Sequence, residues 1–263
     1  MKRAFIDTPE GQIHYRIDGS GEPLLLLHRV GLSSDEYAEM MPILGRTFRV
    51  IAMDILGCGE SDQPPNEPKF VDYVRNVEHF LAALKIQKTN VFGHLLGGSI
   101  AVDMAATHPE MINKMVLWDC AYVDPEVLKQ DQSKFHNKRM EFKEDGSHLT
   151  DLWKSISPKT LNNLEIVQRL AVDYLRSGLG TRAEDSHRAL VAYNIEPKLR
   201  RIKCPTLLLY TQVSVFLQRL EAAKKLIPGC QTRIIGDTLP YPFWEKPEVL
   251  IQPINEFLQN PGV

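Results

Sequence analysis

The chain has 263 residues, of which 43% are hydrophobic and 24% are charged, and its formal net charge is −2. This composition is ordinary for one globular domain with a sizeable core, and it disfavours nucleic acids and anionic membrane surfaces as partners. The longest apolar runs are of strand length and the first residues lack an apolar signal core, so we expect a cytoplasmic chain without a membrane span.

The predicted elements alternate between short apolar strands and helical patterns. Segments 4–7 and 12–17 flank the turn-rich stretch 8–11, which suits an antiparallel hairpin. A helix is expected over 70–86, where apolar residues recur at helical spacing. The other predicted strands are 23–28, 48–54, 89–92, 114–119, 206–211 and 232–236. This alternation is typical of an α/β fold in which helices cover both faces of a mostly parallel sheet.

The stretch from about Val123 to Pro197 interrupts this alternation. It is richer in charged residues, and its pattern indicates several helices. We therefore expect a helical cap of residues 123–198, inserted after the sixth strand into a core made of residues 1–122 and 199–263.

Four motifs, in this order along the chain, resemble those of the α/β-hydrolase superfamily. They are Leu24–Ser34, Asp54–Asp62, Gly93–Gly97 and Tyr241–Glu248. The first is similar to a His-Gly oxyanion loop, the second to an Asp-x-x-Gly-x-Gly-x-Ser turn, and the third to a Gly-x-Ser-x-Gly nucleophile elbow. The fourth is similar to the segment that follows the catalytic histidine. The resemblance implies an eight-stranded, mostly parallel sheet with an inserted helical cap.

Each position at which this family carries its catalytic groups departs from the pattern. Leu95 takes the place of the serine, and leucine has neither a lone pair nor a proton for nucleophilic catalysis. Ser214 takes the place of the acid and Pro240 that of the histidine, while the last histidine of the chain is His187. Arg29 replaces the glycine of the oxyanion loop. We therefore expect the catalytic Ser, Asp and His all to be replaced.

Altered site positions within preserved motifs favour an engineered origin, in which a hydrolase pocket was rebuilt for a small apolar ligand or a non-native reaction. Such a pocket needs no cofactor. Its candidate ligand-binding residues are Arg29, Leu95, Leu96, Asp119, Val213, Ser214 and Pro240. Arg29 either holds a carboxylate or phosphoryl group bidentately or is a solvated charge. The main-chain amides of Leu96 and of Arg29 or Val30 are candidate oxyanion donors.

Two alternatives stay open. In the first, Cys58 or Cys120 is the nucleophile of an esterase-like enzyme acting on activated esters, with a nearby histidine, His28 or His94, as the base. The structural alternatives are a buried thiol and a histidine that supports the loop. In the second, the protein is a natural, non-catalytic binding protein. The four cysteines lack metal-type spacing, so we expect a reduced chain without a metal site.

Overall fold

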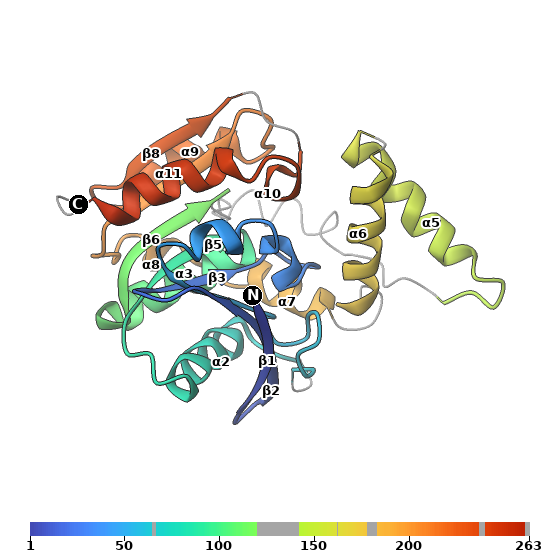
Figure 1. Ribbon diagram of the computed structural model, residues 1–263, viewed down its shortest axis with the longest axis horizontal. Coiled ribbons are helices and arrows are strands. Elements are labelled where there is room, and N and C mark those ends of the chain that lie inside the picture. Colours follow the sequence, from blue (N-terminus) through green and yellow to red (C-terminus); the bar gives the residue numbers. More distant parts are fainter. Residues whose placement is uncertain (65–66, 120–141, 162, 178–182, 237–239, 261–263) are drawn as a thin grey trace.

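The computed structural model describes residues 1–64, 67–119, 142–161, 163–177, 183–236 and 240–260. In these ranges eight strands form one sheet in the order β1-β2-β4-β3-β5-β6-β7-β8 (Figure 1). The strands are β1 (Lys2–Thr8), β2 (Gly11–Asp18), β3 (Pro23–Leu27), β4 (Arg49–Met53), β5 (Thr89–His94), β6 (Ile112–Trp118), β7 (Thr206–Thr211) and β8 (Gln231–Ile235). Strand β2 pairs antiparallel with β1 and β4, and all other neighbours are parallel. The predicted α/β class with a mostly parallel eight-stranded sheet is confirmed.

The central strands are continuous apolar runs because both of their faces are buried. Successive side chains of a strand point to opposite sides of the sheet. In β3, Leu25 and Leu27 accordingly belong to one core cluster, and Leu24 and Leu26 belong to the other. All four leucines are fully buried. The run therefore specifies a strand with a helical layer on each side.

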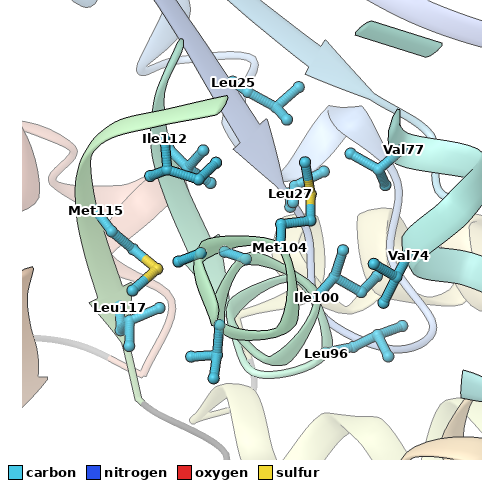
Figure 2. Close-up of a cluster of buried hydrophobic side chains, with 14 of the residues drawn as sticks. Leu25, Leu27, Val74, Val77, Leu96, Ile100, Met104, Ile112, Met115 and Leu117 are labelled. Atoms are coloured by element: carbon cyan, nitrogen blue, oxygen red, sulfur yellow. The ribbon is translucent and has the colours of Figure 1, made fainter. Parts of the chain in front are cut away.

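The helices divide between these two clusters. Helices α2 (Phe70–Ala83), α3 (Leu96–Thr107), α7 (Ala183–Val191), α8 (Glu196–Leu199) and α9 (Leu220–Leu226) contribute to the first. Figure 2 shows the side chains of α3 between those of β3, β6 and α2. Helices α1 (Met41–Leu44), α10 (Pro242–Glu245) and α11 (Glu248–Gln259) contribute to the second. None of the helices within the described ranges is long and apolar enough to cross a bilayer.

The described part of the predicted cap is helical. Helices α5 (Ser147–Ile156) and α6 (Leu164–Arg176) pack against each other at one end of the molecule (Figure 1). Helix α7 contacts α2 and α3 of the core. The described ranges also contain four short 3₁₀ turns: η1 (Ser34–Tyr37), η2 (Pro109–Met111), η3 (Ser157–Thr160) and η4 (Leu217–Arg219). The boundaries of the cap at 123 and 198 stay a prediction, and residues 123–141 lie outside the described ranges.

Candidate functional site

The turn between β5 and α3 has the geometry of a strained elbow. Leu95, at its tip, has φ 45° and ψ −102°, a conformation that a leucine rarely adopts. A Cβ atom on Gly97 would lie 2.1 Å from the carbonyl oxygen of Leu27, and one on Gly93 would lie 2.6 Å from Cα of Gly98. The two glycines therefore allow backbones to approach closely on both sides of the turn. Leu95 itself is partly exposed at the carboxyl edge of the sheet.

A buried carboxylate ties this elbow to the loop after β3. Glu36 is fully buried, and one of its oxygens lies 2.5 Å from Nδ1 of His94. Its other oxygen accepts a hydrogen bond of 3.1 Å from the main-chain amide of Arg29. Burial alone would raise the pKa of Glu36, but His94 and the Arg29 guanidinium hold it below its ordinary value. Because Glu36 occupies the Arg29 amide, the amides of Val30 and Leu96 are the remaining oxyanion candidates.

The guanidinium group of Arg29 has hydrogen-bond donors that the described residues leave without acceptors. Its Nε and Nη2 atoms are buried and have no hydrogen-bond partner among the described residues, although the residue as a whole is partly exposed. The guanidinium carbon lies 5.4 Å from the centroid of the Tyr241 ring. Burial alone would lower the pKa of Arg29, but the oxygens of Tyr174, Glu36 and Tyr241 raise it. The side chain is therefore a cation with free donors.

Two further polar atoms without a partner lie at the end of β6. Trp118 Nε1 and Asp119 Oδ1 are buried, and neither has a hydrogen-bond partner in the described part of the chain. The Trp118 ring stacks on His94 with the ring centroids 4.0 Å apart, so it lies directly behind the elbow. Burial raises the pKa of Asp119, whereas His94, the Ser214 hydroxyl and Arg29 act in the opposite direction. The Asp119 carboxyl therefore interacts electrostatically with His94 of the elbow and with Arg29.

The residues predicted to replace the acid and the base lie after β7 and β8. Ser214 is partly exposed, and its Oγ accepts a hydrogen bond of 3.0 Å from the amide of Phe216. Val213 is 56% exposed, so it lines the site less than the sequence suggested. Pro240 is exposed and precedes α10. Since parallel strands end at one edge of a sheet, these positions lie at the same edge as Leu95.

His28 occupies a structural position. It is fully buried, its Nδ1 lies 2.8 Å from the carbonyl oxygen of Arg29, and its Nε2 accepts a hydrogen bond of 2.9 Å from the amide of Ile55. Burial lowers its pKa, so the ring is neutral near pH 7. Both ring nitrogens are engaged by the backbone. The geometry thus favours the supporting role and gives the predicted catalytic role no support.

The structure also gives no support to the predicted nucleophilic role of Cys58. Cys58 is 1% exposed, and burial together with the nearby carboxylates of Asp54 and Asp173 raises its pKa to about 12. A thiol in these surroundings stays protonated, which does not favour a nucleophile. Cys120 lies outside the described ranges. Within those ranges, no group of three or more His, Cys, Asp or Glu side chains is placed to hold a metal ion.

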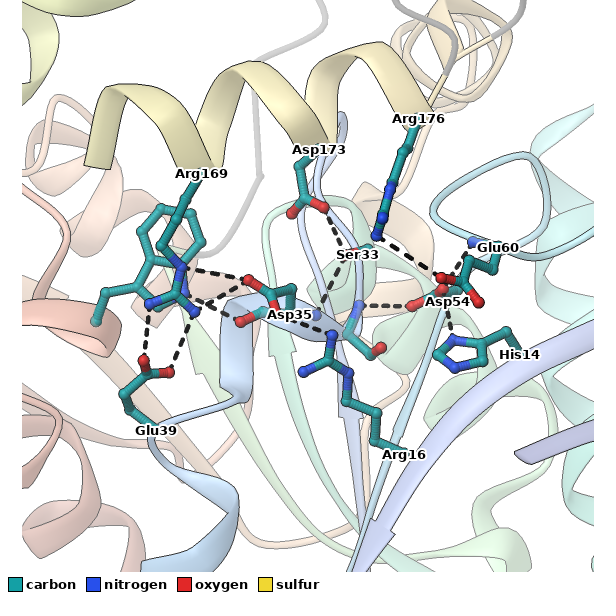
Figure 3. A network of polar contacts seen from close by, with 12 residues as sticks. His14, Arg16, Ser33, Asp35, Glu39, Asp54, Glu60, Arg169, Asp173 and Arg176 are labelled. Carbon is teal, nitrogen blue, oxygen red and sulfur yellow. Dashed lines mark hydrogen bonds and ion pairs between the residues drawn. The ribbon is translucent and has the colours of Figure 1, made fainter. Parts of the chain in front are cut away.

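Helix α6 is held on the loop after β3 by a polar seam, which we define as Ser33, Asp35, Glu39, Arg169 and Asp173 (Figure 3). The guanidinium of Arg169 lies 3.0 Å from Asp35 and 2.7 Å from Glu39. Ser33 Oγ donates a hydrogen bond of 2.8 Å to Asp173. Burial raises the pKa of Asp173 to about 7, against the effect of the Ser33 hydrogen bond. The seam therefore joins a predicted cap helix to the core beside the site.

Sequence reasoning did not single out Glu36, Trp118 or Asp173. Glu36 and Asp173 belong to no motif, and their partners are 58 and 140 residues away along the chain. Trp118 lies within the predicted strand 114–119, which was the only signal it gave.

A sequence profile of the alpha/beta hydrolase fold matches residues 22–247. Similar curated proteins include 2-hydroxy-6-oxo-6-(2'-aminophenyl)hexa-2,4-dienoic acid hydrolase of Metapseudomonas resinovorans, 29% identical over 47% of this chain and 44% of the relative. Another is 2-hydroxymuconate semialdehyde hydrolase of Pseudomonas sp. (strain CF600), 37% identical over 40% of this chain and 38% of the relative. The chain thus spans less than half the length of the curated relatives it matches.

Solved structures resemble the whole chain. The enol-lactonase of Burkholderia xenovorans LB400 superposes with a TM-score of 0.81 at 19% identity, over 98% of this chain and 100% of that one. A thermophilic esterase of Thermogutta terrifontis gives a TM-score of 0.78 at 23% identity, over 98% of both chains. At this level of identity the likeness concerns the fold alone.

Proposed function

The chain belongs to the α/β-hydrolase fold family, and from this premise we propose that it binds a small organic molecule at the carboxyl edge of its sheet without forming an acyl-enzyme at the elbow. The observation that carries the proposal is Leu95. The elbow places this residue where the fold presents its nucleophile, yet its side chain has no atom that can attack a carbonyl.

The two positions predicted to replace the acid and the base support the same proposal. Ser214 Oγ accepts a hydrogen bond from a backbone amide, and a hydroxyl cannot provide the charge of a carboxylate. Pro240 has no titratable group, and no histidine follows it in the sequence. His28, the nearest histidine after β3, has both ring nitrogens engaged by the backbone. Neither position 240 nor His28 therefore offers a base to a nucleophile at this edge.

The elbow backbone nevertheless keeps its strain, which costs about 1–3 kcal/mol for a residue in such a conformation. The close packing of Gly93 and Gly97 against neighbouring backbone accompanies this conformation. The amide of Leu96 belongs to the first turn of α3, where a helix leaves its amides without an intrahelical acceptor. A ligand oxygen is a suitable acceptor for this amide.

The names of the relatives point to small organic substrates, since they are hydrolases of a dienoic acid and of a semialdehyde. We carry over only the class of ligand, a small organic molecule. An engineered origin has no support in the fold or in the relatives, and it stays a prediction. A cysteine-dependent esterase also lacks support at Cys58, because that thiol is buried and protonated.

A labelling experiment tests the proposal. The wild-type protein and the variant Leu95→Ser/Ser214→Asp/Pro240→His are incubated with a fluorophosphonate probe, and adducts are located by peptide mass spectrometry. We expect no adduct on the wild type and an adduct at position 95 of the triple variant. Hydrolysis of p-nitrophenyl acetate should follow the same pattern.

The matched control is Leu95→Ala/Ser214→Asp/Pro240→His, which has the same acid and base but no nucleophile. It should stay unlabelled. An adduct on the wild type accompanied by ester turnover would contradict the proposal and identify a nucleophile elsewhere. A triple variant that folds, as judged by circular dichroism, but stays inert would show that 214 and 240 are not the acid and base positions.

A further inference from the structure

Three groups near the elbow carry polar atoms that the protein leaves without partners. They are the Nε and Nη2 atoms of Arg29, Nε1 of Trp118 and Oδ1 of Asp119, all buried and without partners in the described ranges. Native proteins leave few buried polar atoms unsatisfied, because each costs about 1–3 kcal/mol. Such atoms grouped in one place indicate a binding partner that completes them.

The three groups lie around Leu95. Arg29 follows β3 and Asp119 follows β6, and these two strands flank β5, which leads into the elbow. A chain of aromatic contacts joins Arg29 to Trp118. The Arg29 guanidinium lies over the Tyr241 ring. The ring centroids of Tyr241 and Phe243 are 5.8 Å apart, and those of Phe243 and Trp118 are 5.5 Å apart. Arg29 and Leu95 are both partly exposed, so the cluster borders the surface, while the two Arg29 nitrogens without partners are themselves buried.

We propose that Arg29 binds the carboxylate of an organic acid, with its Nε and Nη2 atoms as paired donors and with Leu95, Trp118 and Tyr241 around the apolar body of the acid. Nε and Nη2 form the side edge of the guanidinium, whose two parallel N–H groups match the two oxygens of a carboxylate. This inference rests on the proposed function and specifies its class of ligand.

The remaining atoms without partners fit the same ligand. Trp118 Nε1 is a donor that can reach a further oxygen, and Asp119 Oδ1 can accept a hydrogen bond from a hydroxyl or amine on the acid. The aromatic rings of Tyr241, Phe243 and Trp118 offer apolar surface to the rest of the molecule. An unbranched or aromatic carboxylic acid therefore suits the cluster better than an inorganic anion.

A purely internal role for Arg29, as the counter-ion of Glu36, is the main competing explanation. Both oxygens of Glu36 are already engaged, one by the His94 ring and one by the Arg29 main-chain amide. The structure describes no hydrogen bond or ion pair between the Arg29 guanidinium and Glu36, so the two charges interact at longer range. The donors on the edge of the guanidinium stay available.

Matched pairs of acids and amides test the inference. Benzoate, phenylacetate and hexanoate are compared with benzamide, phenylacetamide and hexanamide by ligand-observed NMR titration of the wild-type protein. We expect at least one acid to bind about 10- to 100-fold more tightly than its amide, which is the effect of charge-assisted hydrogen bonds. In Arg29→Met this preference should disappear.

Two variants serve as controls. Arg46→Met removes an exposed arginine elsewhere and should keep the preference for the acid. Arg29→Lys keeps the charge but lacks the paired donors, so its preference for the acid should fall between those of the wild type and Arg29→Met. If Arg29→Met does not fold, Arg29→Lys is the test variant. Equal binding of acid and amide, a preference retained in Arg29→Met, or no binding of any acid would overturn the inference. Amide binding without a preference for the acid would leave the proposed function intact, and fluorophosphonate labelling would overturn that function separately.

Discussion

Arg169 in α6 and Arg29 in the loop after β3 lie at the same end of the molecule, but the protein treats their guanidinium groups in opposite ways. All three nitrogens of Arg169 donate hydrogen bonds, to Asp35 and to Glu39, and its guanidinium carbon lies 4.4 Å from the Trp244 ring centroid. Arg29 instead leaves two buried nitrogens without partners in the described ranges.

This contrast distinguishes a polar group whose partners hold the fold together from one whose donors lack partners within the described ranges. Arg169 is 22% exposed and its charge is matched by two carboxylates, so its contacts can be understood without anything else being bound. The Nε and Nη2 atoms of Arg29 are buried without a hydrogen-bond partner in the described ranges, which costs free energy in the folded protein. The contacts of the polar seam are those of a stabilising network, and we propose that the Arg29 donors beside the elbow serve binding.

Breaking the elbow itself should have the largest effect. In Gly97→Ala, the new Cβ atom would lie 2.1 Å from the Leu27 carbonyl oxygen, which is fixed in β3 and cannot move away. We expect a loss of about 3 kcal/mol or more in the free energy of unfolding, measured by urea denaturation. Gly98→Ala is the matched control in the same helix, since its closest contact would be 3.1 Å, and it should cost clearly less. Equal losses would mean that the close approach of Gly97 to the Leu27 carbonyl oxygen does not determine the cost.

Breaking the polar seam should have the next largest effect. Arg169→Met removes the hydrogen bonds to Asp35 and Glu39 and leaves both carboxylates near α6, so we expect a loss of about 2 kcal/mol in urea denaturation. Arg176→Met is the control on the same helix. Arg176 is 55% exposed and 3.7 Å from Glu60, so its removal should cost less than about 0.5 kcal/mol. Similar losses for the two variants would remove the distinction drawn for Arg169.

The outline of the fold was predictable from the sequence because it depends on local patterns, and the candidate site was predicted from the same motifs. Leu24–Leu27 identifies a strand buried on both faces, and Gly93–Gly97 identifies a turn that only closely packed glycines allow. Leu95 and Arg29 were assigned to the site for the same reason.

The polar interior was not predictable from the sequence, because it depends on partners far apart along the chain. The hydrogen bond from Ser33 to Asp173 joins residues 140 positions apart, and no hydrophobic periodicity of the sequence predicts it. Cys58 shows the same limit. A motif can place its thiol at the sheet edge, but it does not tell whether the thiol is exposed or buried, and Cys58 is only 1% exposed. Burial and pairing are decided by the tertiary packing.

The polar seam should also make stability depend on pH through Asp173. Its pKa is about 7 in the folded protein and 3.8 ordinarily, so folding favours the protonated carboxyl between these values. The contribution of Asp173 is therefore most favourable near the lower value and is lost as the pH rises towards 7. Asp173 is 3% exposed, and we expect about 2 kcal/mol between pH 5 and pH 7.

Asp173→Asn isolates this contribution, because it keeps an oxygen that can accept the Ser33 hydrogen bond but cannot ionise. The stability of the variant relative to the wild type should increase from pH 5 to pH 7 in urea denaturation. A constant difference over this range would mean that Asp173 is ionised in the folded protein at pH 5, and the seam would then contain a full charge that its partners stabilise.

The smallest effect on stability is expected where the largest effect on binding is proposed. Arg29→Met removes two unsatisfied donors and keeps an unbranched apolar chain in their place, while Glu36 retains its bonds to the His94 ring and to the main-chain amide of residue 29. The cost of losing the long-range attraction to Glu36 and the gain from removing desolvated donors should nearly cancel. We therefore expect the free energy of unfolding, measured in urea without ligand, to change by less than about 1 kcal/mol. A loss as large as that of Arg169→Met would show that the Arg29 guanidinium is part of the scaffold, and the contrast between the two arginines would no longer separate binding from stability.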